Sequence, residues 1–123
     1  MIKAVFMDYT GTMVKEDEPY TRELVGYFAS HSDLKDPNEI LKVVWTRIKI
    51  IEAKSFGDSF LLNDEKIDLI LEYCAREHGL KGDFAYIHEV WHKVWVYAPL
   101  FEDVKPFFDR TKLPVYVLSN DDM

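Results

Sequence analysis

Two short polar segments contain the residues best suited to chemistry, and each follows a run of apolar residues. Asp8 comes directly after residues 4–7, Ala-Val-Phe-Met, and opens the segment Asp-Tyr-Thr-Gly-Thr. A carboxylate at the end of a buried strand is costly unless it is paired, metal-bound or open to water. In open α/β sheets, ligands bind just past the carboxyl ends of the strands. Asp8 is therefore the first candidate for a functional carboxylate; the alternative is a turn residue that caps its own loop.

The second segment lies near the other end of the chain, where residues 113–118 read Leu-Pro-Val-Tyr-Val-Leu and precede Ser119 and Asn120. Pro114 is acceptable at the first position of a strand, although not deep inside a central one. Two aspartates follow, so this strand also ends in small polar residues. The sequence therefore predicts two short apolar strands whose ends suit a phosphate or a carboxylate.

The two segments resemble two motifs of the haloacid dehalogenase (HAD) superfamily. The first motif is an apolar strand followed by Asp-x-Asp-Gly-Thr, with other residues allowed at the third position, and here it runs from Asp8 to Thr12. The second is an apolar strand that ends in Ser or Thr, often Ser-Asn, and here it is Ser119-Asn120. The resemblance implies an α/β fold, with a Rossmann-like parallel-sheet core and an inserted α-helical cap.

The same resemblance divides the chain into a core and a cap. The core would comprise residues 1–15 and 98–123, and the cap would comprise residues 16–97. Hinges are expected near residues 15–19 and 97–99. Closing such a cap over the core would exclude water and complete a site.

The superfamily has two further motifs, a Lys and one or two acidic residues that help to hold Mg²⁺, and the chain reaches Met123 before either. We therefore expect only part of the core, within a longer chain of roughly 200 residues. A sheet generally needs about three strands, or packing on helices, for independent stability. A missing C-terminal part or a homo-oligomer would supply the remaining cover.

By the same resemblance, Asp8 is the catalytic nucleophile, which attacks phosphorus and forms an aspartyl phosphate. The expected cofactor is Mg²⁺, held by the Asp8 carboxylate and the backbone carbonyl of Thr10, since this ion prefers oxygen ligands. Ser119 would hydrogen-bond a phosphoryl oxygen, aided by N–H groups near Asn120, and Thr12 joins the phosphate-binding residues. The expected activity is Mg²⁺-dependent hydrolysis of a small phosphorylated metabolite.

Thr10 departs from most phosphatases of this superfamily, which carry an Asp there as general acid/base. Loss of such a group typically lowers the rate by ~10²–10⁴-fold. Haloacid dehalogenase-like chemistry therefore stays open, in which Asp8 attacks carbon and a cap residue, here Arg47, engages the substrate carboxylate. Phosphonatase-like chemistry would need a cap lysine, for which Lys49 and Lys54 are candidates. All three cations also fit a solvated helix surface, and a non-catalytic fragment or binding module is the alternative of another class.

Between the two segments, apolar residues at helical spacing predict a helical bundle. Asp36 followed by Pro37 marks a helix start, and Gly79 follows a helix end. The turn at residues 56–58, Phe-Gly-Asp, is either a substrate-specificity loop of the cap or a plain turn. The expected helices cover residues of about 19–28, 37–54, 64–78, 84–96 and 102–109.

Residues 88–92 read His-Glu-Val-Trp-His, and on a helix His-Glu-x-x-His can bind Zn²⁺ with the Glu as general base. Lys93 directly after the second histidine, and the lack of a downstream His, weigh against a zinc metalloprotease. Glu102 is the nearest downstream acidic residue that could be a third ligand. The favoured interpretation is a cap helix with His88 and His92 outward, and with Ile87, Val90, Trp91 and Val94 inward.

Composition narrows the classes of protein. The 123 residues, 48% of them apolar and 15% aromatic, are enough for one folded domain. The net charge of −7 repels nucleic-acid phosphates, so we expect a small-molecule substrate and no nucleic acid. No apolar run approaches a membrane span or a signal peptide. A single cysteine, Cys74, suits a reducing cytoplasm.

Overall fold

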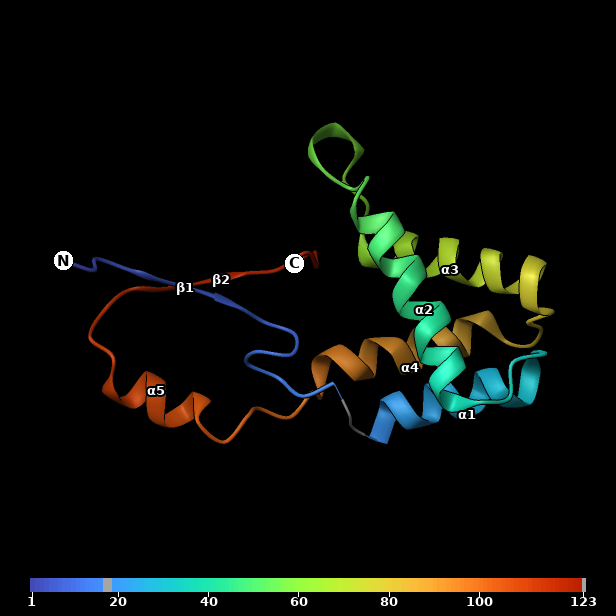
Figure 1. The fold of residues 1–123 in the computed structure, drawn as a ribbon, viewed down its shortest axis with the longest axis horizontal. Coiled ribbons are helices and arrows are strands. Elements are labelled where there is room, and N and C mark those ends of the chain that lie inside the picture. Colours follow the sequence, from blue (N-terminus) through green and yellow to red (C-terminus); the bar gives the residue numbers. More distant parts are fainter. Residues whose placement is uncertain (17–18, 123) are drawn as a thin grey trace.

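A computed structural model of the chain describes residues 1–16 and 19–122. Two short strands come from opposite ends of the chain, and long helices fold between them (Figure 1). In chain order the elements are β1 (Val5–Asp8), α1 (Pro19–His31), α2 (Pro37–Glu52), the 3-10 helix η1 (Gly57–Ser59), α3 (Asn63–His78), α4 (Phe84–Val96), α5 (Val104–Arg110) and β2 (Val115–Leu118).

Local sequence explains where the helices begin and end. Asp36 caps α2 by accepting a hydrogen bond from the Asn38 N–H at 2.8 Å, with Pro37 in the first turn. Gly79 ends α3 in the left-handed conformation, with a φ of 63°. The predicted helices are confirmed, although several ends differ: α1 continues to His31, and α2 stops at Glu52.

The start of α3 differs from the prediction by one residue. We expected Asp64 to begin this helix, whereas α3 begins at Asn63. The Glu65 carboxylate accepts a hydrogen bond from the Leu62 N–H at 2.7 Å, which caps the helix from within its first turn. Asp64 is thereby left in that turn, with an exposed side chain.

Helices α1 to α4 pack around one hydrophobic core, as the apolar periodicity predicts. On α4, Ile87, Val90 and Trp91 are buried, and Val94 is partly exposed. Burial of each large aliphatic or aromatic side chain contributes about 1.5–3 kcal/mol. Among the described residues, no helix is both long enough and apolar enough to cross a membrane. The largest fully buried side chains are Phe28, Ile40, Ile67, Ile70, Leu71, Cys74, Ile87 and Val90.

Strands β1 and β2 pair in parallel, with Asp8 opposite Leu118, as predicted for this fold class. The polar segments that follow the two strands therefore meet at the same edge of the sheet. As expected for two strands without further cover, the sheet is exposed: Phe6 is 65% exposed, and its ring stacks on that of Tyr116, with the ring centres 5.4 Å apart. Each strand has one strand neighbour within the described residues, so each has one edge without a strand beside it.

The helices join the sheet through two adjacent segments. Val14 and Leu100 form an antiparallel bridge, beside which the Lys15 N–H donates to the Pro99 carbonyl at 2.8 Å. The expected hinge at residues 97–99 lies at this bridge. The other expected hinge includes residues 17 and 18, which lie outside the described residues. The division into core and cap remains a prediction.

A small second hydrophobic cluster beside the bridge contains Met13, Val14 and Val104.

Candidate active site

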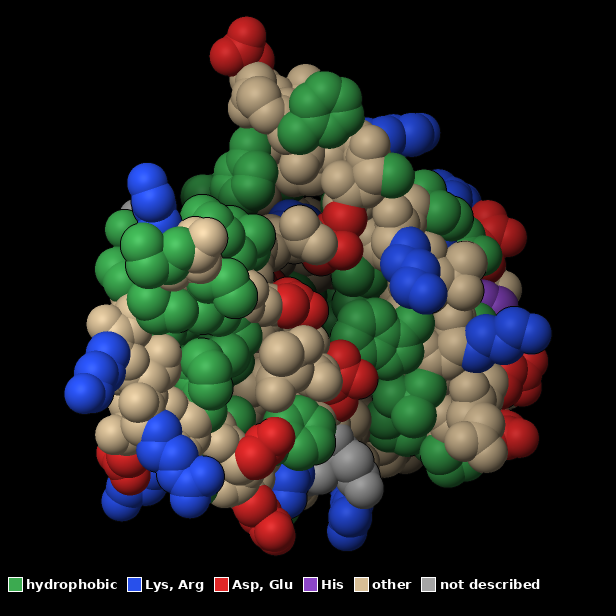
Figure 2. Space-filling model, turned by 60° about the vertical axis from the view of Figure 1, so that its left-hand side comes forward, with side chains coloured by type: hydrophobic (Ala, Val, Ile, Leu, Met, Phe, Trp, Pro, Cys, Tyr) green, Lys and Arg blue, Asp and Glu red, His purple; other side chains and the backbone are tan. Residues whose placement is uncertain are grey.

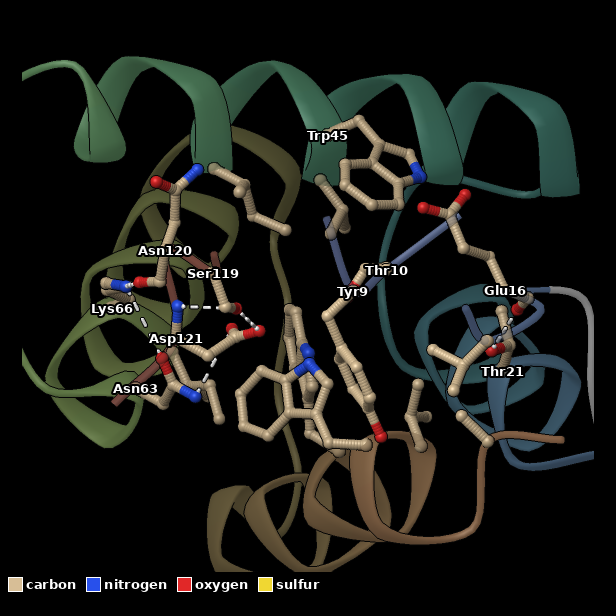
Figure 3. Close-up of a pocket in the computed structure, with 18 of the residues that line it drawn as sticks. Tyr9, Thr10, Glu16, Thr21, Trp45, Asn63, Lys66, Ser119, Asn120 and Asp121 are labelled. Atoms are coloured by element: carbon tan, nitrogen blue, oxygen red, sulfur yellow. Dashed lines mark hydrogen bonds between the residues drawn. The ribbon is translucent and has the colours of Figure 1, made fainter. Parts of the chain in front are cut away.

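A cavity of about 490 Å³ lies between the carboxyl ends of the two strands and helices α1 to α4. Figure 2 shows a hollow in one face of the molecule, with acidic side chains around it and hydrophobic side chains on either side. Figure 3 shows Trp45 pointing into the cavity from α2. Much of the wall is apolar, and half of its polar residues lie at the ends of the two strands. The apolar helix residues of the wall are Leu24, Leu41, Val44, Trp45, Ile48, Ile67, Ile70, Trp91, Val94 and Trp95.

The loop after β1 holds the Asp8 carboxylate at the cavity wall. Asp8 Oδ1 accepts a hydrogen bond from the Tyr9 N–H at 2.9 Å, so Oδ2 is the oxygen better placed to react. The loop turns at Gly11, whose φ of 76° favours glycine. Thr10 and Val14 form an isolated β-bridge: the Gly11 N–H donates to the Val14 carbonyl, and the Val14 N–H donates to the Tyr9 carbonyl. This bridge leaves the Thr10 carbonyl for another partner.

The loop after β2 brings the second predicted motif to the same cavity. The Ser119 hydroxyl donates to Asp121 Oδ2 at 2.7 Å, and its oxygen accepts from the Asp121 N–H at 3.1 Å. The other Asp121 oxygen accepts from the Asn63 side chain at 3.4 Å, and Asp122 accepts from the Asn63 N–H at 2.6 Å. The first turn of α3 therefore positions this loop, and Ser119 lines the cavity together with Asp8.

Lys66 of α3 is a cavity residue that the sequence analysis missed. It is only 7% exposed, and its Nζ donates to the Asn120 carbonyl at 2.5 Å and to Asn63 Oδ1 at 3.4 Å (Figure 3). Both of these partners are neutral, and a buried charge is costly unless it is compensated. The nearby Glu52 carboxylate compensates the charge in part, and an anion in the cavity would add to that compensation. Along α3, Lys66 has the spacing of an ordinary helix charge, so no local pattern identifies it.

Glu52, at the end of α2, adds a partly exposed carboxylate to the same wall. Burial raises the pKa of Glu52, the nearby Lys66 lowers it in part, Asp121 raises it further, and a hydrogen bond from the Asn120 amide at 3.5 Å lowers it. The wall carries more negative than positive charge, which favours a bound cation. Its carboxylates are those of Asp8, Glu16, Glu52 and Asp121, and its lysines are Lys15 and Lys66.

The raised pKa of Glu52 predicts a pH-dependent effect of Glu52→Gln. Below the ordinary value of 4.5, the carboxyl is protonated in both the folded and the unfolded state. As pH rises from there through the raised folded pKa, the unfolded state ionises first, and the folded state loses stability relative to it. Gln avoids this loss, so the variant should gain stability relative to the wild type at neutral pH. Thermal denaturation from pH 4 to 8 measures the difference, and a larger gain at acid pH would contradict the assigned cause.

Other residues predicted for the site lie outside the cavity wall. The Arg47 guanidinium lies 4.1 Å from the centre of the Tyr73 ring, and its buried Nε has no hydrogen-bond partner in the described part of the chain. The two lysines proposed for a Schiff base are exposed on the surface. The turn at residues 56–58 is exposed as well, as in a plain turn between helices. The residues outside the wall are Thr12, Arg47, Lys49, Lys54 and the turn at residues 56–58.

The His-Glu-x-x-His segment lies on α4, as predicted. Glu89 Oε1 accepts a hydrogen bond from Lys93 Nζ at 2.8 Å, so the expected general base of a protease is engaged in a surface ion pair. The carboxylate that meets the two histidines belongs to Asp64 of α3, upstream in the chain. Hydrogen bonds from His92 and His88 lower the pKa of Asp64. The carboxylate expected from the sequence as a third ligand was that of Glu102, which lies downstream.

The cavity wall offers oxygen donors of the kind that Mg²⁺ prefers, namely carboxylate and carbonyl oxygens. The cavity wall offers the carboxylates of Asp8 and Asp121, and Thr10 lines it with a carbonyl that its bridge leaves unused. The excess of negative charge on the wall also favours a bound cation. These three residues are the ones that would hold the ion.

Comparison with solved structures supports the fold. The chain is similar to an L-2-haloacid dehalogenase from Xanthobacter autotrophicus, with a TM-score of 0.64 and 15% sequence identity, over 99% of this chain and 48% of that one. The chain thus spans about half the length of that dehalogenase. The similarity confirms the predicted HAD-like α/β fold. No protein-family model and no curated protein matches the chain.

Proposed function

We propose that the protein is a HAD-type hydrolase that uses Asp8 as nucleophile on a small phosphorylated metabolite, with Mg²⁺ as cofactor. The observation that supports this most is a single cavity lined by Asp8 and Ser119, from the ends of two parallel strands, and by the buried Lys66. A nucleophile, a hydroxyl donor and a cation around one cavity are the parts that phosphoryl transfer needs.

In this proposal, Asp8 Oδ2 attacks phosphorus while the bond from phosphorus to the alcohol oxygen breaks, and the leaving oxygen takes a proton from water. Water then cleaves the aspartyl phosphate, which releases inorganic phosphate and restores the carboxylate. The Ser119 hydroxyl turns from Asp121 to a phosphoryl oxygen, and Lys66 compensates its negative charge. Mg²⁺, which Asp8, Asp121 and the Thr10 carbonyl would hold, would supply further compensation of that charge.

The shape of the cavity limits the substrate. A volume of about 490 Å³ lies in the lower part of the range for small-molecule sites, roughly 300–1,000 Å³. Three tryptophans, Trp45 of α2 and Trp91 and Trp95 of α4, also line it. We therefore infer a substrate with one anionic group at the strand ends and a compact, largely apolar body against the helices.

A second candidate function is dehalogenase-like hydrolysis, in which Asp8 attacks carbon. Thr10 favours it, because a threonine hydroxyl cannot act as a general acid near neutral pH, and a halide leaving group needs no proton. The apolar wall also suits a short carbon chain. The excess of carboxylates favours the first candidate, since it would repel a substrate carboxylate more than it would a phosphate shared with Mg²⁺.

An activity panel separates these functions. The purified protein is assayed with phosphate monoesters, 2-haloacids and an aldehyde phosphonate, each with Mg²⁺ and with a chelator. We expect phosphate release that requires Mg²⁺. Halide release that is insensitive to chelation would overturn the phosphatase proposal in favour of the second candidate. No turnover of any class would favour a binding module.

Thr10→Asp tests the same distinction within the site. A carboxylate here can protonate the leaving alkoxide and then activate water, so phosphomonoester hydrolysis should rise about tenfold. This is less than the full ~10²–10⁴-fold of an optimised general acid, because the loop is built around threonine. Thr10→Asn, which matches the size of Asp without its proton chemistry, should give no rise. A fall in phosphatase rate with both variants would contradict the proposed reaction.

A further inference from the structure

Four side chains capable of metal coordination meet on the surface between α3 and α4, apart from the wall of the candidate active site. His88 and His92 lie one turn apart on α4, and Asp64 and Asp68 lie one turn apart on α3. One ligand atom from each of Asp64, His88 and His92 lies within 4.8 Å of the other two. Two histidines and a carboxylate with converging atoms form a ligand set for a divalent metal ion.

The distances within this cluster are close to those of a coordinated ion. Asp64 Oδ1 lies 2.7 Å from His92 Nε2 and 3.1 Å from His88 Nδ1. Ligand atoms around a tetrahedral Zn²⁺ are about 3.3 Å apart, given bond lengths of about 2.0–2.1 Å. Side-chain movements of a few tenths of an ångström would therefore be enough to admit the ion. The Asp64 side chain is 61% exposed, which leaves a path for entry and room for a water ligand.

Asp68 adds a further feature that is typical of metal sites. His88 faces Asp64 with Nδ1, and its other nitrogen, Nε2, lies 2.7 Å from Asp68 Oδ1. Histidines that bind metals usually donate their second ring N–H to a carboxylate, which fixes the tautomer and the ring orientation. Asp68 is placed to do this for His88. An incidental surface ion pair does not require this arrangement of two carboxylates on opposite sides of one imidazole.

We propose that Asp64, His88 and His92 bind a divalent transition-metal ion, with Zn²⁺ preferred, and that Asp68 orients His88. Imidazole ligands favour Zn²⁺ over Mg²⁺, which takes oxygen ligands. The ion has a structural role: it ties the first turn of α3 to α4. Glu89 is not a ligand, because it pairs with Lys93.

The position of this site relative to the cavity gives the ion a further effect. Asp64 lies between Asn63 and Lys66, and both of these residues hold the loop after β2. An ion at Asp64 would therefore stiffen the turn that positions Ser119. The metal site does not depend on the proposed function, since binding can be measured without any substrate.

Zn²⁺ titration of the chelator-treated protein, without an affinity tag, tests the proposal. Calorimetry should show one Zn²⁺ per chain, Zn²⁺ should raise the Tm, and Mg²⁺ should do neither. Co²⁺ should give the visible absorption of a tetrahedral site. His88→Ala and His92→Ala should each abolish the 1:1 binding and the Zn²⁺-induced rise in Tm, and Asp64→Ala should greatly weaken both. Asp68→Asn should weaken binding by about 10–100-fold without abolishing it.

Matched variants complete the experiment. Glu89→Gln changes the same motif and His31→Ala removes a histidine elsewhere, and both should bind Zn²⁺ like the wild type. Each variant is compared with its own metal-free form, so a change in basal stability does not affect the result. Failure of the wild type to bind one Zn²⁺, or undiminished binding by a protein lacking both His88 and His92, would overturn the proposal. Loss of binding in Glu89→Gln would overturn the ligand assignment.

Discussion

Replacing Asp8 by Asn should lower hydrolysis by roughly 10⁴- to 10⁶-fold, the scale on which covalent hydrolases lose activity without their catalytic residues. An amide cannot attack phosphorus. The amide oxygen of the new side chain can still accept the hydrogen bond from the Tyr9 N–H that the Asp8 carboxylate accepts at 2.9 Å. The loop should therefore keep its conformation, and the loss should be chemical. The rate of phosphate release from the best substrate of the panel measures it, with circular dichroism as the check on folding.

A matched control and a second readout make this result specific. Asp58→Asn alters an exposed carboxylate in η1, outside the cavity wall, and should keep full activity. Wild-type protein should also form a covalent phosphoryl adduct that can be trapped by acid quenching, and the Asp8 variant should not. Full activity in the Asp8 variant, or an adduct on another residue, would remove Asp8 from the role of nucleophile.

Replacing Lys66 by Met should reduce kcat/KM by about 10²-fold. A hydrogen bond to a charged group contributes about 1.5–3 kcal/mol, and each 1.36 kcal/mol corresponds to a factor of about ten. Met keeps the length and the apolar stem of the side chain, and therefore the packing on α3. It removes the cation that compensates the substrate anion, and it removes the hydrogen bond to the Asn120 carbonyl at 2.5 Å. Steady-state kinetics and thermal denaturation measure both consequences.

The comparison with a surface lysine separates binding from folding. Lys54→Met removes a lysine that was also a candidate from the sequence, but that lies just after α2 and outside the cavity wall, and should leave the kinetics unchanged. If Lys66 binds the substrate anion, KM should rise and inhibition by inorganic phosphate should weaken in the Lys66 variant alone. A lower Tm with unchanged KM and unchanged phosphate inhibition would make Lys66 purely structural.

The sequence predicts those features of the fold and the candidate site that depend on short stretches of the chain. Helix α2 follows from Asp36, Pro37 and an apolar stripe, and the structure reproduces its start to the residue. The meeting of Asp8 and Ser119 follows from one rule, since parallel strands place their carboxyl ends at the same edge. These predictions needed no knowledge of how the helices pack.

The parts that could not be predicted depend on contacts between distant residues. Lys66 and Asn120 lie on different elements, and only the packing of α3 against the loop after β2 turns an ordinary helix lysine into a cavity cation. Asp64 meets His92 for a similar reason, through the packing of α3 against α4. Arg47 shows the converse: its spacing suited a substrate ligand, yet packing places its guanidinium over Tyr73.

The antiparallel bridge between Val14 and Leu100 closes the base of the helical segment. The chain leaves at Lys15 and returns at Pro99, and one backbone hydrogen bond of 2.8 Å joins these points. The pairing of these two backbone segments fixes where the helical segment begins and ends. For a flexible loop, each doubling of its length adds only about 0.6 kcal/mol to the entropic cost of bringing its ends together. A shorter, longer or differently shaped set of helices could be grafted onto this base, by evolution or by an engineer. Such a graft would change what the cavity admits, but it would have to keep the contacts of Asn63 and Lys66 that position the loop after β2.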